Sequence, residues 1–174
     1  MSVAKMLVPL GCALSFAIAA QGQSLPPPFI EYAAKFTCGA ESPKEPDDVV
    51  SGVYASSINI HNPYAGLTVK FFKKIVVANR EGAAPGPVLI LDDSAFLRPD
   101  RAERVDCVLI HKRLNQPPTA YVEGFVVIEV RRLLDPPFQP LLDVVAKYTA
   151  RPLPPNSGVS TQSVVPIDGK VITR

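Results

Sequence analysis

The chain has 174 residues, 47% of them hydrophobic and 20% charged, with a formal net charge of +2 at pH 7. This length supports one ordinary domain with one core and is too short for two. The near-neutral charge and the lack of any block of like charges argue against a nucleic-acid partner.

The first residues have the pattern of a secretory signal peptide. Lys5 precedes an apolar run over residues 6–20, and the small residues Ala19, Ala20 and Gly22 follow as an exit. The run is shorter than the roughly 20 apolar residues that a membrane span needs. We therefore expect an exported protein, periplasmic or secreted, with no stable membrane insertion after the signal is removed.

These features divide the chain into a signal peptide over 1–22, a proline-rich leader over 23–29 and a single domain over 30–174. The nineteen prolines fall between the apolar runs. Proline lacks the N–H that a sheet ladder needs, so it is confined to strand starts, edges and turns. The prolines therefore separate many short strands.

Apolar residues alternate with a period of two, which predicts half-buried strands. The clearest case is residues 30–38, where Ile30, Tyr32, Ala34, Phe36 and Cys38 share one face. Further strands are predicted at 53–61, 67–78, 88–91, 105–110, 121–130 and 142–150, and short β segments follow at 159–165 and 171–173. Residues 94–103 are the one place where a helical turn fits. Seven or eight such strands predict an all-β fold, an antiparallel β-sandwich, with a small closed barrel as the alternative.

Two cysteines remain after signal removal, Cys38 and Cys107, because Cys12 lies in the signal peptide. In an oxidising compartment such a pair is most simply a disulfide. Free structural thiols and a metal site are the competing interpretations. A metal site is poorly supported because neither cysteine belongs to a C-x-x-C motif.

The sequence carries no recognisable catalytic constellation. It has two histidines, His61 and His111, whereas a catalytic zinc usually needs three protein ligands. Asp143 is an isolated carboxylate with no evident partner for acid–base chemistry. No G-x-S-x-G, P-loop or dinucleotide motif occurs. We expect no catalytic residue, no metal and no cofactor, and a hydrolase is unsupported.

Two groups of residues are candidates for binding. The first is a polar rim where a strand enters a proline turn, made of Tyr54, Asn59, His61, Asn62 and Tyr64. Aromatic area and amide hydrogen bonds there would suit a ligand. The alternative is that the asparagines satisfy the backbone of the turn.

The second group lies within residues 67–78, where apolar residues alternate with lysines, and a bulge is predicted near Lys73 and Lys74. The segment is predicted to be either an edge strand protected by its lysines or an assembly surface. The candidate assembly residues are Lys70, Phe71, Phe72, Lys73 and Lys74.

The order of motifs resembles a family of exported, uncharacterised bacterial proteins over nearly the whole mature chain. The residues that carry the resemblance are Tyr32–Gly39, Gly52–Ala55, Ile58–Pro63, Asp106–Cys107, Gly124–Glu129 and Leu142–Ala150. A weaker, fold-level similarity is to the sensory rhodopsin transducer group, small β-sandwich proteins that form oligomers and act by binding. The connection over 131–141 is longer than such proteins imply, and no catalytic residue is carried over.

The leading hypothesis is an exported, non-enzymatic β-sandwich that binds a protein partner, either a second copy or an envelope component. Strands with accessible edges suit partner binding by strand addition. A small-ligand or glycan-binding module at the polar rim is the alternative, although the chain has no tryptophan to act as a glycan platform.

Overall fold

The computed structural model describes residues 28–41, 50–79, 82–131, 141–152 and 160–173. The predicted signal peptide, most of the predicted leader and most of the long connection over 131–141 lie outside the described residues. The elements are β1 (Phe29–Glu41), β2 (Gly52–Asn62), β3 (Val69–Val77), β4 (Val88–Leu97), β5 (Arg101–Asp106), α1 (Cys107–Leu114), β6 (Val122–Arg131), β7 (Asp143–Pro152), β8 (Thr161–Ile167) and β9 (Lys170–Ile172).

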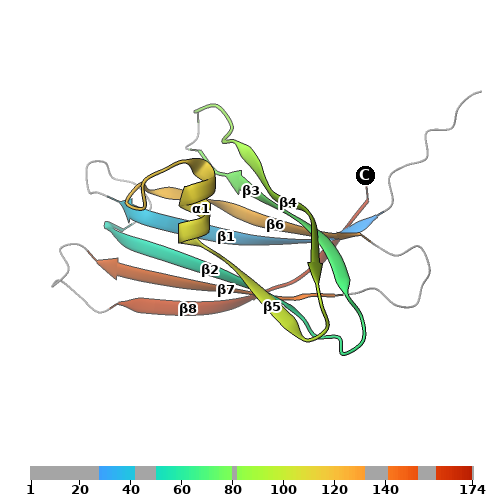
Figure 1. Ribbon diagram of the computed structural model, residues 1–174. Coiled ribbons are helices and arrows are strands. Elements are labelled where there is room, and N and C mark those ends of the chain that lie inside the picture. The colour runs from blue at the N-terminus through green and yellow to red at the C-terminus, as the bar shows by residue number, and fades with distance from the viewer. Residues whose placement is uncertain (1–27, 42–49, 80–81, 132–140, 153–159, 174) are drawn as a thin grey trace, which may run out of the picture.

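The nine strands form one antiparallel sheet in the order β4-β3-β6-β1-β2-β7-β8, with β5 paired to β2 and β9 paired to β1. The predicted all-β fold is confirmed, and the described residues contain nine strands where the sequence predicts seven or eight. The sheet does not close, so the barrel alternative is wrong. β1 and β2 pair only where Gly39–Glu41 meets Gly52–Tyr54. Beyond this junction the β4-β3-β6-β1 half and the β2-β7-β8 half separate into two layers (Figure 1).

β1 shows why the sequence folds this way. Its apolar alternation places Tyr32 and Phe36 in the core, and they join Ile58 and Ile60 of β2 in one buried cluster. Full burial of side chains of this size contributes about 1.5–3 kcal/mol each. At Gly39 the backbone has φ 93°, which glycine adopts readily. A Cβ there would lie 2.0 Å from the Ala120 carbonyl oxygen, so this approach requires glycine.

The strand predicted over 105–110 is wrong, because β5 ends at Asp106 and α1 begins at Cys107. The Asp106 side chain caps the helix by accepting a hydrogen bond from the Leu109 amide. Asn115 ends it in the left-handed conformation, and basic residues occupy the last turn. The capping residues at both ends stabilise this helix. The short apolar run by itself is compatible with either a helix or a strand.

The helical turn predicted over 94–103 is also wrong. β4 continues to Leu97, and after a turn at Asp100, with φ 51°, the chain re-enters the sheet as β5. β4 pairs with β3 and β5 pairs with β2, so this turn carries the chain from one half of the sheet to the other.

β3 is an interior strand and not the predicted edge strand, because it pairs with β4 on one side and β6 on the other. The predicted bulge is confirmed by register shifts around Lys73. The strands at the two ends of the order are β4 and β8. Within the described sheet, each of these two strands therefore has one side without a paired strand along its length.

The predicted disulfide is confirmed. Cys38 on β1 and Cys107 at the start of α1 are bonded, with Cα atoms 5.5 Å apart and a sequence separation of 69 residues. The bond holds α1 against β1 and β2, where the Ser56 amide donates to Cys107 Sγ at 3.1 Å. Among the described residues, no helix is long and apolar enough to cross a membrane.

Candidate functional site

The five residues of the predicted polar rim do not form one site. Tyr54 lies near the start of β2 and His61 near its end, so about 23 Å of strand separates them. The Tyr54 ring meets the Tyr121 ring edge to face at 6.1 Å, and its hydroxyl donates to the Val50 carbonyl. Tyr54 therefore belongs to the opposite end of the sheet from His61.

Asn62 is fully buried, at 0% exposure, and acts as a structural residue. Its Nδ2 lies 2.7, 2.9 and 3.1 Å from the carbonyl oxygens of Leu67, Leu97 and Arg98. Its Oδ1 accepts from the Tyr64 amide at 3.1 Å. One side chain thus holds the β2–β3 and β4–β5 connections together, and Asn62 lies in the interior and not on the exposed rim predicted from the sequence.

His61 lies between two carboxylates on the outer face. Its Nδ1 is 3.1 Å from Asp143 Oδ2, and its Nε2 is 3.3 Å from Asp100 Oδ1. Asp143, which has no evident partner in the sequence, is directly opposite His61 in the β2–β7 register. The hydrogen bonds to Asp143 and then Asp100 raise the pKa of His61. Among the described residues, the hydrogen-bond partners of the His61 ring are two carboxylates. No hydroxyl group that could act as a nucleophile is bonded to it there.

The remaining rim residues are spread out. Asn59 is exposed on the outer face of β2, paired with Arg104 and Val145. The Tyr64 hydroxyl accepts from the Leu141 amide at 3.0 Å. His111 is buried in α1, with Nε2 3.0 Å from the Ala120 carbonyl oxygen. Within the described parts of the chain, no three His, Cys, Asp or Glu side chains form a metal-binding group.

The lysines of β3 bind other side chains of the domain. Lys73 Nζ lies 2.6 Å from Glu103 Oε1, and Lys74 pairs with Glu129. Lys70 lies over the Phe96 ring, 5.3 Å from its centroid. Phe71 and Phe72 complete the candidate assembly segment, with Phe71 buried in the core and Phe72 half-buried.

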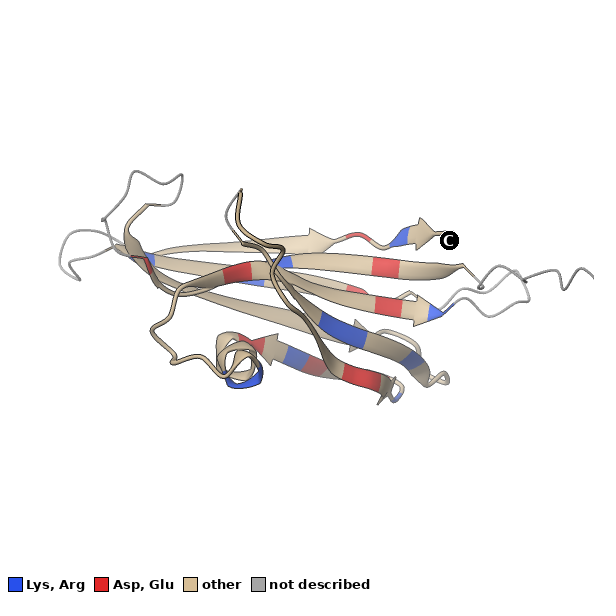
Figure 2. Ribbon diagram, turned by 90° about the horizontal axis from the view of Figure 1, so that it is seen from above, with Lys and Arg blue, Asp and Glu red and all other residues tan. Residues whose placement is uncertain are grey.

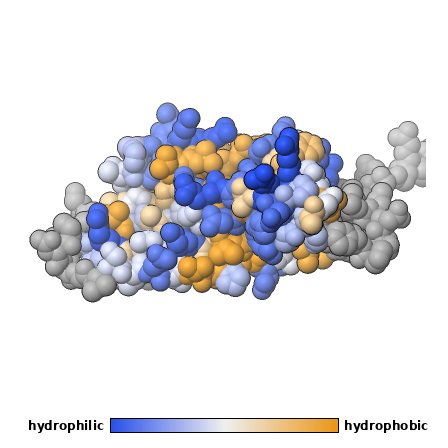
Figure 3. Space-filling view, turned by 60° about the horizontal axis from the view of Figure 1, so that its bottom comes forward, coloured by the Kyte–Doolittle hydropathy of each residue, from blue (hydrophilic) through white to orange (hydrophobic). Residues whose placement is uncertain are grey.

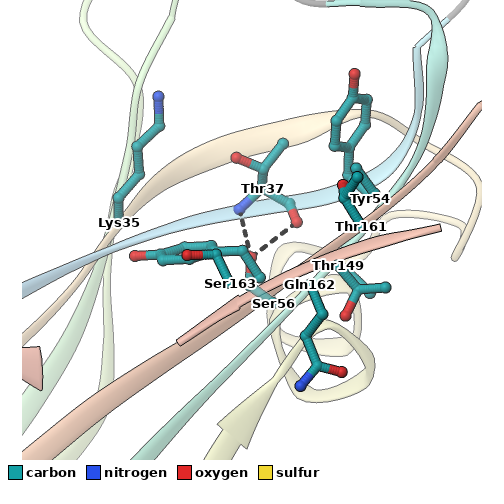
Figure 4. Close-up of a pocket in the computed structure, with 11 residues that line it drawn as sticks. Lys35, Thr37, Tyr54, Ser56, Thr149, Thr161, Gln162 and Ser163 are labelled. Atoms are coloured by element: carbon teal, nitrogen blue, oxygen red, sulfur yellow. Dashed lines mark hydrogen bonds between the residues drawn. The ribbon is translucent and has the colours of Figure 1, made fainter. Parts of the chain in front are cut away.

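A hollow of about 390 Å³ lies between the edge of β1 and the inner face of β2, β7 and β8 (Figure 4). Most of the residues that line it carry a hydroxyl or an amide group, although the larger part of the lining surface is apolar. The lining residues are Lys35, Thr37, Tyr54, Ala55, Ser56, Tyr148, Thr149, Ala150, Thr161, Gln162 and Ser163.

The hollow exists because the partners of β1 change along its length. On the side away from β6, β9 pairs with Phe29–Glu31 and β2 pairs with Gly39–Glu41. Between these stretches the Ser56 hydroxyl takes the place of a strand, accepting from the Thr37 amide at 2.9 Å and donating to the Thr37 carbonyl at 3.0 Å (Figure 4).

The same geometry places further backbone groups in the gap. In an antiparallel strand, alternate residues direct both N–H and C=O to the same side. Because Thr37 faces β2, Lys35 and Ala33 face this gap, whereas Ala34 and Phe36 bond to β6. We call the hollow together with the Ala33–Lys35 edge the β1 slot.

The slot has little net charge. Lys35 Nζ lies 3.3 Å from Glu123 Oε2, and the other lining side chains are neutral. Burial raises the pKa of the Tyr148 hydroxyl further above the ordinary value of tyrosine, so this group also carries no charge at neutral pH. Basic and acidic residues are interspersed over the ribbon, with no broad area of one sign in the view from above (Figure 2). The site suits a neutral ligand with both apolar surface and hydrogen-bonding groups.

Of the residues that line the slot, only Tyr54 is among the binding residues predicted from the sequence. A signal for the others exists in the predicted strands, because Ser56, Thr161 and Ser163 occupy inward positions that apolar residues usually fill. Such positions indicate that the inner face is polar there and is not covered by the opposite layer.

No protein-family model, no curated protein and no solved structure matches this chain. The resemblance to exported bacterial proteins, and the weaker one to the sensory rhodopsin transducer group, stay predictions.

Proposed function

We propose that this is an exported, non-enzymatic binding protein, periplasmic or secreted, whose ligand is a protein partner. The observation that carries the proposal is the β1 slot, where backbone and hydroxyl groups of the domain line an open hollow. The signal-like residues 1–22 and the Cys38–Cys107 disulfide support an oxidising compartment.

Two described side chains with catalytic potential, Ser56 and His61, are occupied by structural contacts. The Ser56 hydroxyl bonds both backbone groups of Thr37, and His61 bonds two carboxylates. A nucleophile needs an adjacent base that takes its proton, and these two groups lie on opposite faces of β2. This separation favours binding over catalysis.

A small-ligand or glycan site is the second candidate, and it moves from the predicted rim to the β1 slot. The hydroxyls of Ser56, Thr161 and Ser163 and the rings of Tyr54 and Tyr148 are groups that bind sugars in other sites. We favour a protein ligand because the exposed part of β1 offers backbone donors and acceptors in pairs. The backbone of an extended polypeptide repeats the complementary groups at the same spacing, whereas a sugar does not.

Self-association is assigned to β4 in place of the predicted β3. β4 has one neighbour in the described sheet, and Val88 and Ile90 are 61% and 58% exposed. Residues 88–91 carry neither a charge nor a proline, whereas β8 contains Pro166. Apolar patches lie between hydrophilic ones on the side of the molecule shown in Figure 3.

The proposal is tested by photocrosslinking in cells that export the full chain. A photoreactive residue at Ser163 points into the slot, and one at Val164 on the same strand points outward and serves as the control. We expect a protein adduct from position 163 and none from 164. Equal adducts from both positions, or binding of labelled oligosaccharides in place of a protein adduct, would contradict the proposal.

A further inference from the structure

We infer that the β1 slot binds one extended polypeptide segment, antiparallel to β1, as an added strand between β9 and β2. This inference rests on the proposed function and names the chemical form of its ligand. It follows from the direction of the backbone groups, the length of the gap and the chemistry of the inner wall.

The backbone of β1 supplies the hydrogen bonds. Ala33 and Lys35 direct N–H and C=O toward the gap, because Thr37, four residues after Ala33 and two after Lys35, bonds Ser56 on that side. The β6 ladder takes the alternate residues. An incoming segment therefore forms two hydrogen-bonded residue pairs with β1 without displacing a strand of the described sheet.

The length of the gap limits the ligand. β9 ends its pairing at Glu31 and β2 begins its pairing at Gly39, so the intervening edge is about 26 Å long. The Ser56 hydroxyl closes the Thr37 position, which shortens the accessible edge. The slot thus fits a segment of about five residues.

The direction of the segment follows from its neighbours. β9 and β2 are both antiparallel to β1 and lie in line on the same side of it. A segment that continues this line runs the same way, and antiparallel ladders are slightly more stable per residue than parallel ones.

The inner wall selects side chains at alternate positions. Directly opposed residues of an antiparallel pair point to the same face of a sheet. Segment residues opposite Ala34 and Phe36 therefore point inward, toward the hydroxyls of Tyr148 and Ser163. Residues opposite Ala33 and Lys35 point outward to solvent. The wall favours Ser, Thr or Asn at the inward positions, because they supply partners for these hydroxyls.

Amide hydrogen exchange of the purified protein tests the open edge. We expect the amides of Ala33 and Lys35 to exchange at least about 100-fold faster than those of Ala34 and Phe36, which bond to β6. Equal, slow exchange at all four positions would overturn the inference, because the edge would already be occupied.

A display library of random seven-residue segments then tests the ligand. We expect enriched segments to carry Ser, Thr or Asn at alternate positions and to slow exchange at Ala33 and Lys35. Lys35→Pro removes one slot-facing N–H and should weaken binding at least about 10-fold, whereas Lys35→Ala keeps that N–H and should bind nearly as wild type. Thermal unfolding confirms that both variants fold.

The outcomes separate this inference from the proposed function. Enriched segments that leave Ala33 and Lys35 unprotected, or that bind Lys35→Pro as well as Lys35→Ala, would overturn the added strand. A protein adduct at Ser163 would in that case still support a protein ligand. If Lys35→Pro does not fold, protection of the wild-type amides by an enriched segment decides the question.

Discussion

The ammonium group of Lys73 on β3 lies 2.6 Å from Glu103 Oε1 on β5, and this ion pair joins the two halves of the sheet. Both side chains face inward, with exposures of 11% and 32%. Lys73 therefore links two layers and does not protect an edge. The pair contributes to the packing of β5 against β3, which have no hydrogen-bonded ladder between them.

Lys73→Met should lower the free energy of unfolding by about 2–3 kcal/mol, because it leaves the Glu103 carboxylate partly buried without a partner. The double variant Lys73→Met/Glu103→Leu should regain part of this loss, since no charge is left unpaired. Urea denaturation of both variants and of Glu103→Leu measures the coupling. Strictly additive effects would show that the pair is not coupled.

His61 should make stability depend on pH in a specific direction. Hydrogen bonds to Asp143 and Asp100 raise its folded pKa, so the protonated form is favoured in the folded state. This stabilisation is present below the unfolded pKa of about 6.5 and is lost as pH rises through the folded value. We expect the Tm difference between wild type and His61→Gln to shrink from about pH 6 to about pH 8. A difference that grows with pH would contradict this assignment.

Asn62 and Asn59 are a matched pair on opposite faces of β2. Asn62→Ala removes the side chain that bonds three carbonyls and one amide, and should cost about 2–3 kcal/mol of stability. Asn59→Ala changes an exposed residue and should stay within about 0.5 kcal/mol of wild type. Chemical denaturation compares them, and similar losses for the two variants would refute the structural role of Asn62.

The Cys38–Cys107 bond should contribute about 2–4 kcal/mol, because it closes a loop of 69 residues in the unfolded chain. The Cys38→Ala/Cys107→Ala variant measures this contribution by denaturation. Non-reducing mass spectrometry of the exported protein should show the mature chain two hydrogens lighter than its reduced form. Two alkylatable thiols on that protein would contradict the bond.

The edge of β4 should support weak self-association. Ile90→Lys places a charge on this edge and should lower any dimer fraction in sedimentation experiments at high concentration. Lys70→Ala on β3 is the control and should leave association unchanged, because β3 is enclosed by β4 and β6. Loss of association in the control instead of the test variant would exclude the β4 edge.

Much of the strand content follows from local sequence patterns. In β1 the period-two alternation identified the buried face correctly, because side chains of a strand must point to opposite sides. The disulfide was also predictable, since only Cys38 and Cys107 remain outside residues 1–22. The helix after Asp106 was predictable in principle from its N-cap and from the helical spacing of Cys107, Ile110, His111 and Leu114.

Which strands are neighbours, and which side chains meet, depends instead on how distant segments pack in the folded domain. The lysines of β3 resemble edge protection in the sequence, but their partners Glu103 and Glu129 lie 30 and 55 residues away. The β1 slot likewise depends on where β9 and β2 pair with β1. A local pattern shows which face of a strand is apolar, whereas an open backbone edge depends on the whole order of the sheet, which is set by contacts between distant segments.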